Sequence, residues 1–156
     1  MKTAMFVDIQ NIYYTTRDTF GRSFNYKNFW NQIESKNKII AANAYAIDRQ
    51  DDKQQKFQYA LQTIGFNVKL KPYISRSDGS TKGDWDVGIT IDILESAQEV
   101  EKIILLSGDG DFDVLVKRVI DKYKCIVDVF GVKELTADSL IRAATNFYPI
   151  TESQLI

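Results

Sequence analysis

Short apolar runs alternate along this chain with longer amphipathic segments, and this alternation restricts the fold more than any other feature of the sequence. The apolar runs are typical of strands, and the amphipathic segments of helices. We predict strands at 3–8, 39–47, 66–73, 103–107 and 125–130, with a candidate short strand at 146–150. We predict helices at 26–36, 52–64, 85–94, 111–122 and 137–144.

Strands separated by helices favour a three-layer, Rossmann-like α/β fold, with a mostly parallel central sheet and helices on both faces. The first and fourth predicted strands are the most continuously apolar, so we place them in the middle of the sheet. The third strand alternates apolar and polar residues and contains Pro72, which suits an edge. These features fit a strand order of 3-2-1-4-5.

Residues 85–94 carry two conflicting signals. Apolar and polar residues alternate strictly in this segment, which taken alone is a strand pattern. Parallel third and fourth strands, however, need a long crossover between them, and this segment is the only candidate. Val87, Ile91 and Leu94 would form a helical stripe, and we therefore predict a helix.

The chain has no histidine and one cysteine, Cys125. The missing histidine excludes hydrolases with a histidine base, zinc sites with histidine ligands and RNA cleavage by paired histidines. A single cysteine excludes an intrachain disulfide and a cysteine zinc cluster. Any acid–base or metal chemistry must therefore rest on carboxylates. The net charge of −1 argues against a chain that coats nucleic acid, but it is compatible with a local basic rim.

No apolar run approaches the length of a membrane span, and the first residues lack the cleavage site of a signal peptide. We therefore expect a cytoplasmic protein. The length of 156 residues suits one domain, which we place at 1–150, with 151–156 as a C-terminal tail. The oligomeric state stays open, with a homodimer among the options.

Several aspartates fall where predicted strands end. Asp8 ends the first strand, Asp109 follows the fourth, and Asp111 lies two residues further on. If these strands are neighbours, they flank the point where the strand order reverses, and ligands of such folds bind there. Asp86 opens the helix before the fourth strand and can converge on the same rim. The alternative is a purely structural role, in which "SGDGD" is an ordinary turn and Asp113 is a solvated side chain in the first turn of a helix.

Three or four carboxylates in one crevice repel one another and lose hydration, so their charges need compensation. Oxygen ligands without histidine or cysteine favour Mg²⁺ or Mn²⁺. Such an ion suits phosphodiester cleavage, because it polarises the phosphate and lowers the pKa of a bound water. The aspartates are therefore candidate metal ligands.

Three sequence blocks stand in order along nearly the whole chain: "FVDIQNI" at 6–12, "KGDWDVGITIDIL" at 82–94 and "LLSGDGDF" at 105–112. In type and spacing they resemble the NYN domain family, a branch of the PIN-like nucleases that includes bacterial LabA-like proteins. The last block is the most specific, and "SLIRAATNFYPI" at 139–150 is similar to the usual ending of the family. The resemblance implies a PIN-like sheet and a metal-dependent ribonuclease site.

By position in these blocks, the resemblance implies a Mg²⁺ or Mn²⁺ site lined by Asp8, Asp86, Asp109 and Asp111. It also implies supporting side chains at Asn11, Ser107 and Lys82. The middle block is one residue longer than usual, and we choose Asp86 over Asp84 because Asp86 directly precedes Val87. Asp92 matches a family position too, but on a helix it lies well round from Asp86. Its role stays open between the site and an ordinary polar helix residue.

Tyr13 and Tyr14 follow the first block, and we expect Arg17 and Arg22 in a loop after them. Aromatic and cationic side chains beside a site suit the bases and phosphates of RNA, whether single-stranded or structured. Core tyrosines and solvated arginines are equally consistent with the sequence.

The leading hypothesis is a metal-dependent ribonuclease that cuts within RNA chains. A phosphatase or Toprim-like domain would use the same rim, but "DIQ" at 8–10 lacks the second aspartate of the first class. Asp8 also stands where a Toprim domain has glutamate. The alternative from another class is a non-catalytic module that keeps the fold and binds RNA or protein.

Overall fold

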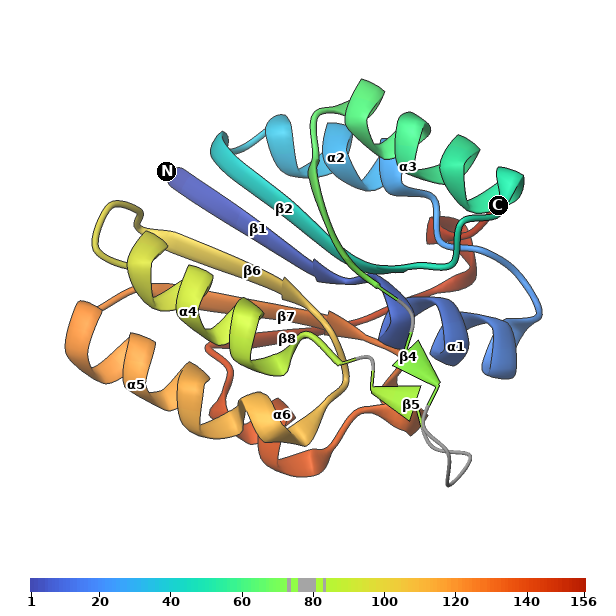
Figure 1. The fold of residues 1–156 in the computed structure, drawn as a ribbon. Coiled ribbons are helices and arrows are strands. Elements are labelled where there is room, and N and C mark those ends of the chain that lie inside the picture. The colour runs from blue at the N-terminus through green and yellow to red at the C-terminus, as the bar shows by residue number, and fades with distance from the viewer. Residues whose placement is uncertain (73, 76–80, 83) are drawn as a thin grey trace.

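A six-stranded sheet forms the middle layer of the computed structural model, which describes residues 1–72, 74–75, 81–82 and 84–156. The strands run in the order β3-β2-β1-β6-β7-β8, and every pairing between them is parallel. This is the order 3-2-1-4-5 of the predicted strands, with the short final strand added beside the fifth. The three-layer α/β fold is thereby confirmed (Figure 1).

The strands of this sheet are β1 (Lys2–Asp8), β2 (Lys38–Asp48), β3 (Asn67–Pro72), β6 (Lys102–Leu106), β7 (Ile126–Gly131) and β8 (Asn146–Pro149). The helices are α1 (Ile9–Phe20), α2 (Tyr26–Glu34), α3 (Asp52–Ile64), α4 (Asp86–Ser96), α5 (Asp113–Tyr123) and α6 (Asp138–Ala143). Short 3-10 turns lie at Gly110–Phe112, Lys133–Leu135 and Glu152–Gln154. An antiparallel hairpin pairs β4 (Ile74–Ser75) with β5 (Thr81–Lys82).

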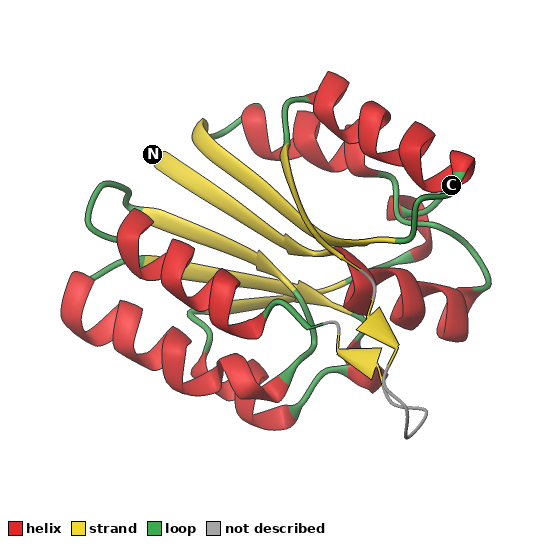
Figure 2. Ribbon diagram, in the orientation of Figure 1, coloured by secondary structure: helices red, strands yellow, loops and turns green. Residues whose placement is uncertain are grey.

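The alternation of side chains along the central strands divides the core into two halves. On β1, Met5 and Val7 face α1, α2 and α3, whereas Ala4 and Phe6 face α4, α5 and α6. All four of these side chains are fully buried. Helices cover both faces of the sheet (Figure 2), so the central strands are apolar at successive positions.

Residues 9–20 form helix α1, where we predicted no helix and expected Arg17 in a loop. The segment contains three threonines, one asparagine and one aspartate, which lower helix propensity. Ile9, Ile12 and Thr16 nevertheless share one buried face at helical spacing. Packing of this face against the sheet outweighs the weak local propensity. Gly21 then ends the helix with a left-handed φ of 66°.

Helix α4 confirms the helix predicted at 85–94, although its buried stripe differs from the predicted one. Ile89 and Ile93 are buried, whereas Val87 and Ile91 are 71% and 50% exposed. Positions two apart lie on nearly opposite sides of a helix, since each residue turns the chain by about 100°. The strand-like alternation of this segment therefore reflects two helical stripes, one against the sheet and one in solvent.

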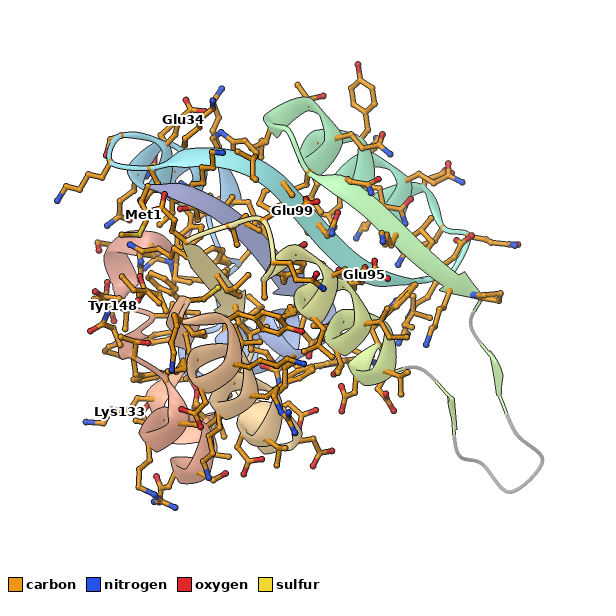
Figure 3. The ribbon with its side chains drawn as sticks, turned by 90° about the vertical axis from the view of Figure 1, so that its left-hand side faces the viewer. Met1, Glu34, Glu95, Glu99, Lys133 and Tyr148 are labelled. Carbon is orange, nitrogen blue, oxygen red and sulfur yellow. The ribbon has the colours of Figure 1, made fainter. Side chains whose placement is uncertain are left out.

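The final residues, 151–156, were expected to be a tail, and in the structure they contact the rest of the chain. Leu155 is buried and forms an isolated bridge with Phe24, and its carbonyl accepts a hydrogen bond from Arg22. Met1 and Glu99 lie at the other end of the sheet, where β1 and β6 begin (Figure 3). Within the described residues, no helix combines the length and apolarity required to cross a bilayer.

Replacement of Ile104 by Ala should lower the free energy of unfolding by about 2–5 kcal/mol, because it leaves a cavity in the central strand β6. Ile104 is 1% exposed, whereas Ile40 on β2 is 43% exposed. Ile40→Ala is the matched control, and we expect it to change stability by no more than about 0.5 kcal/mol. Urea denaturation of both variants is the measurement. Equal losses of unfolding free energy in the two variants would contradict the assignment of β6 to the core.

Candidate metal centre

Three aspartates from three separate segments bring their carboxylates together. Asp8 ends β1, Asp109 follows β6, and Asp86 is the first residue of α4. One carboxylate oxygen from each lies within 4.8 Å of the others, and all three residues are half-buried. We call Asp8, Asp86 and Asp109 the acidic group. The group includes Asp86 and not Asp84, and Asp86 is the residue that we chose because it directly precedes Val87.

The acidic group lies at the point where the strand order reverses, because β1 and β6 are parallel neighbours. Val7 is paired with Leu106, so the residues that follow these two leave the sheet side by side. The Ser107 hydroxyl donates a hydrogen bond to Asp8 Oδ2 at 3.1 Å. The Asn11 side-chain oxygen accepts one from the Gly108 N–H at 2.9 Å. Asn11 and Ser107 therefore tie the two strand ends together.

The loop after β6 fixes the carboxylate of Asp109 by hydrogen bonds within the loop. The Asp109 N–H donates to the Ser107 hydroxyl at 3.1 Å, and Asp109 Oδ1 accepts from the Asp111 N–H at 2.9 Å. Gly108 is required here, because a Cβ at this position would lie 2.8 Å from the Leu135 carbonyl oxygen. The "SGDGD" stretch is thus a turn whose hydrogen bonds orient one member of the acidic group.

Asp86 is positioned by the residues that start α4. Its N–H donates to the Asp84 side chain at 3.1 Å. Next to it, the Trp85 indole N–H donates to the Ala46 carbonyl of β2 at 2.9 Å. A Cβ on Gly88 would lie 2.6 Å from the Trp85 ring, so the ring packs directly over this glycine. The "DWDVG" stretch therefore anchors the beginning of α4 to the sheet.

Burial and repulsion from neighbouring carboxylates make Asp8 and Asp86 hold protons more tightly than ordinary carboxyls. Burial raises the pKa of Asp8 to about 6; the Ser107 hydroxyl and the nearby Asn11 N–H oppose this rise, and the charges of Asp109 and Asp84 add to it. Burial is also the largest cause that raises the pKa of Asp86 to about 7. A hydrogen bond shared with Asp109 and repulsion from Asp109, Asp84 and Asp8 raise it further. A cation would relieve this repulsion.

Asp92 lies outside the acidic group and has partners of its own. Lys69 Nζ on β3 lies 2.7 Å from Asp92 Oδ2, and the Tyr45 hydroxyl on β2 donates to the same oxygen at 2.7 Å. The side chain therefore links α4 to two strands. This geometry matches the ordinary structural role that the sequence left open for Asp92.

Asp111 and Lys82 differ from the expectation in separate ways. The Asp111 side chain is exposed and does not belong to the acidic group, although we expected a fourth ligand here. The 3-10 turn at Gly110–Phe112 explains this, because the turn uses the Asp111 N–H and leaves its carboxylate in solvent. The Lys82 backbone belongs to β5, and its side chain lies outside the described part of the chain.

Tyr13 and Tyr14 lie on the surface of α1 and not in the core, with exposures of 47% and 50%. The Arg17 guanidinium donates to the Tyr13 hydroxyl at 3.2 Å, and that of Arg49 donates to the Tyr14 hydroxyl at 3.5 Å. Arg49, in the segment after β2, had no signal in the sequence that linked it to these tyrosines. Arg22 lies apart from them, with its hydrogen bond to the Leu155 carbonyl.

The acidic group fits a divalent cation. It offers three carboxylates at mutual distances that one ion can bridge, and its donor atoms are all oxygens. Mg²⁺ and Mn²⁺ prefer such donors, whereas zinc sites mostly use histidine and cysteine. The charged neighbours that raise the pKa values of Asp8 and Asp86 are other carboxylates. A cation bound between them would therefore offset several negative charges at once.

Known proteins are similar to this chain in sequence and in fold. The family model of the NYN domain matches residues 2–151. The "Low amplitude and bright protein LabA" of Synechococcus elongatus is 29% identical over 120 residues, which are 72% of this chain and 64% of that protein. The match thus spans less than two thirds of that relative's length.

A crystal structure of a protein of unknown function from Vibrio parahaemolyticus superposes on this chain with a TM-score of 0.94. The two are 48% identical, and the match covers 99% of this chain and 96% of that one. Fold and sequence therefore agree over nearly the full length of a natural homologue. On the family match over residues 2–151, the chain belongs to the NYN domain family.

Proposed function

We propose that this protein is a metal-dependent ribonuclease that hydrolyses phosphodiester bonds within RNA chains. The observation that carries the proposal is the acidic group, in which three carboxylates lie within 4.8 Å of one another. Its place at the reversal of strand order is where ligands of such sheets bind. Membership of the NYN domain family supports RNA as the substrate.

Asp8, Asp86 and Asp109 would hold the ion, for which we propose Mg²⁺ or Mn²⁺. When bound, such an ion polarises the scissile phosphate and lowers the pKa of a water molecule. The protein keeps its ligands in place in advance: the Ser107 hydroxyl holds Asp8, and the Asp111 N–H holds Asp109. Side chains that are already oriented need no reorganisation when substrate and ion arrive.

Replacement of Asp109 by Asn should reduce metal-dependent RNA cleavage by more than about 100-fold. Loss of a residue that only supports a ligand typically costs 10- to 100-fold, and loss of a direct ligand should cost more. The measurement is cleavage of a labelled single-stranded RNA with Mn²⁺, against a chelator-treated sample. Asp113→Asn, in the first turn of α5, is the matched control and should cleave like the parent. Asp111→Asn should lose less activity than Asp109→Asn.

Two outcomes of this assay would count against the proposal. If Asp109→Asn cleaves as fast as the parent, the metal ligands are misassigned. If the parent binds RNA but does not cleave it with either metal, the protein is the non-catalytic module, and the fold serves binding alone.

Mn²⁺ or Mg²⁺ should raise the melting temperature of the parent, because the unfolded chain lacks the assembled acidic group. An ion at 100 times its dissociation constant adds about 2.7 kcal/mol to the free energy of unfolding. Thermal melts across a metal titration give the measurement. Asp109→Asn should lose most of the shift, and Asp113→Asn should keep it. If neither ion changes the melting temperature of the parent, the result argues against a metal site.

Without metal, the acidic group should make the protein less stable as the pH rises from about 5 to about 8. Between pH 4 and pH 7 the folded state holds protons on Asp8 and Asp86 that the unfolded state has released, because their folded pKa values are about 6 and about 7. The unfolded state then binds fewer protons, so the free energy of unfolding falls with pH.

The test is urea denaturation in chelator at several pH values in this range, for the parent and for Asp86→Asn. The variant removes one of the two groups, so its stability should fall less steeply. Parallel curves for the two proteins would contradict the raised pKa of Asp86.

A further inference from the structure

A groove of about 1660 Å³ lies between α1, α2 and α3. Sites for small molecules usually measure about 300–1,000 Å³, so this groove is large enough for a segment of a polymer. Ile9 and Gln10, which directly follow Asp8 in the chain, are among its lining residues. The groove therefore reaches the first turn of α1, next to a member of the acidic group.

The surface of the groove is strongly aromatic. Tyr13 and Tyr14 line it from α1, with their rings 5.2 Å apart and in an edge-to-face arrangement. Tyr59 lines it from α3 and is 71% exposed. Tyr26 and Phe57 also contribute lining side chains, with ring centroids 5.8 Å apart. Exposed rings above an apolar floor are suited to flat, unpaired groups.

Cations accompany these rings. The Arg17 guanidinium lies 5.7 Å from the centroid of the Tyr13 ring and donates to its hydroxyl. Arg49 donates to the Tyr14 hydroxyl from the segment after β2. Lys27 and Lys53 also line the groove, together with the acidic residues Glu34, Asp51 and Asp52. The two arginines thus lie at the wall that carries the two adjacent tyrosines.

The aromatic wall lies within a short distance of the acidic group. Tyr14 follows Asp8 by six residues, which corresponds to a rise of about 9 Å along a helix. A strand with one phosphate at the acidic group can therefore place its neighbouring nucleotides on the wall.

We propose that this groove binds the unpaired RNA segment next to the cleaved phosphate, with bases on Tyr13 and Tyr14 and phosphates at Arg17 and Arg49. In a duplex the bases already stack on one another, so exposed tyrosine rings add affinity only for an unpaired strand. The groove thus selects single-stranded RNA. This inference rests on the proposed ribonuclease function for its choice of ligand.

The test is equilibrium binding of a fluorescently labelled single-stranded RNA of about 12 nucleotides, within the site sizes common for such proteins. Chelator is present throughout, so cleavage does not intervene. Tyr14→Ala should weaken binding by about 5- to 150-fold, the range that loss of one base stack gives. Tyr14→Phe keeps the ring and should bind within about 2-fold of the parent.

Tyr148→Ala is the matched control, because Tyr148 on β8 is 43% exposed and does not line the groove. It should bind RNA like the parent, and thermal melts verify that each variant is folded. A duplex of the same sequence should bind more weakly than the single strand and should be insensitive to Tyr14→Ala.

The inference is overturned if Tyr14→Ala binds single-stranded RNA as tightly as the parent, or if the parent does not bind this RNA at all. It is also overturned if Tyr14→Ala weakens the duplex and the single strand equally. A different result would reject the ribonuclease proposal alone. In that case the parent binds the single strand and Tyr14→Ala weakens this binding, but no RNA is cleaved when Mn²⁺ is supplied.

Discussion

The parallel pairing of β1 with β6 is the interaction on which both the fold and the candidate site depend. It joins the two most apolar strands in the middle of the sheet, where Val7 pairs with Leu106. Burial on both faces keeps the middle of these strands apolar and leaves polar groups to their ends. Asp8 and Ser107 follow the last paired residues, so the hydrogen bond between them is a direct consequence of the strand register. The hydrophobic core thereby sets the position of the carboxylates.

The acidic group works against the stability that this core provides. Its members repel one another, and burial of Asp8 and Asp86 disfavours their ionised forms. Proteins retain such unfavourable arrangements mainly where a site needs them, since substitution could readily relieve the repulsion. The hydrogen bonds from Ser107 and from the Asp111 N–H hold the carboxylates in this unfavourable geometry. A bound cation would turn the same geometry into a source of stability.

The sequence predicted the long, strongly patterned elements and missed those that tertiary contacts decide. The sheet order followed from apolarity, and α4 followed from the need for a crossover, despite its strand-like alternation. Helix α1 escaped prediction because its propensity is weak and its buried face contains Thr16. Asp111 was grouped with the ligands because it stands in the same motif as Asp109. The 3-10 turn at Gly110–Phe112 leaves the Asp111 carboxylate in solvent, which agrees with the alternative of an ordinary turn at "SGDGD".

Buried Asp128 and half-buried Asp92, both outside the acidic group, have partners that compensate their charges. Asp128 lies 3.4 Å from Lys102 Nζ and accepts a hydrogen bond from the Asn146 amide. Asp92 has a lysine and a tyrosine hydroxyl as partners. In both places a basic side chain on a neighbouring strand compensates the charge, as burial of a carboxylate requires. At the carboxyl ends of β1 and β6, the neighbours of Asp8 are instead further carboxylates. The same chain therefore treats carboxylates that are paired internally differently from the acidic group, for which we propose an external cation.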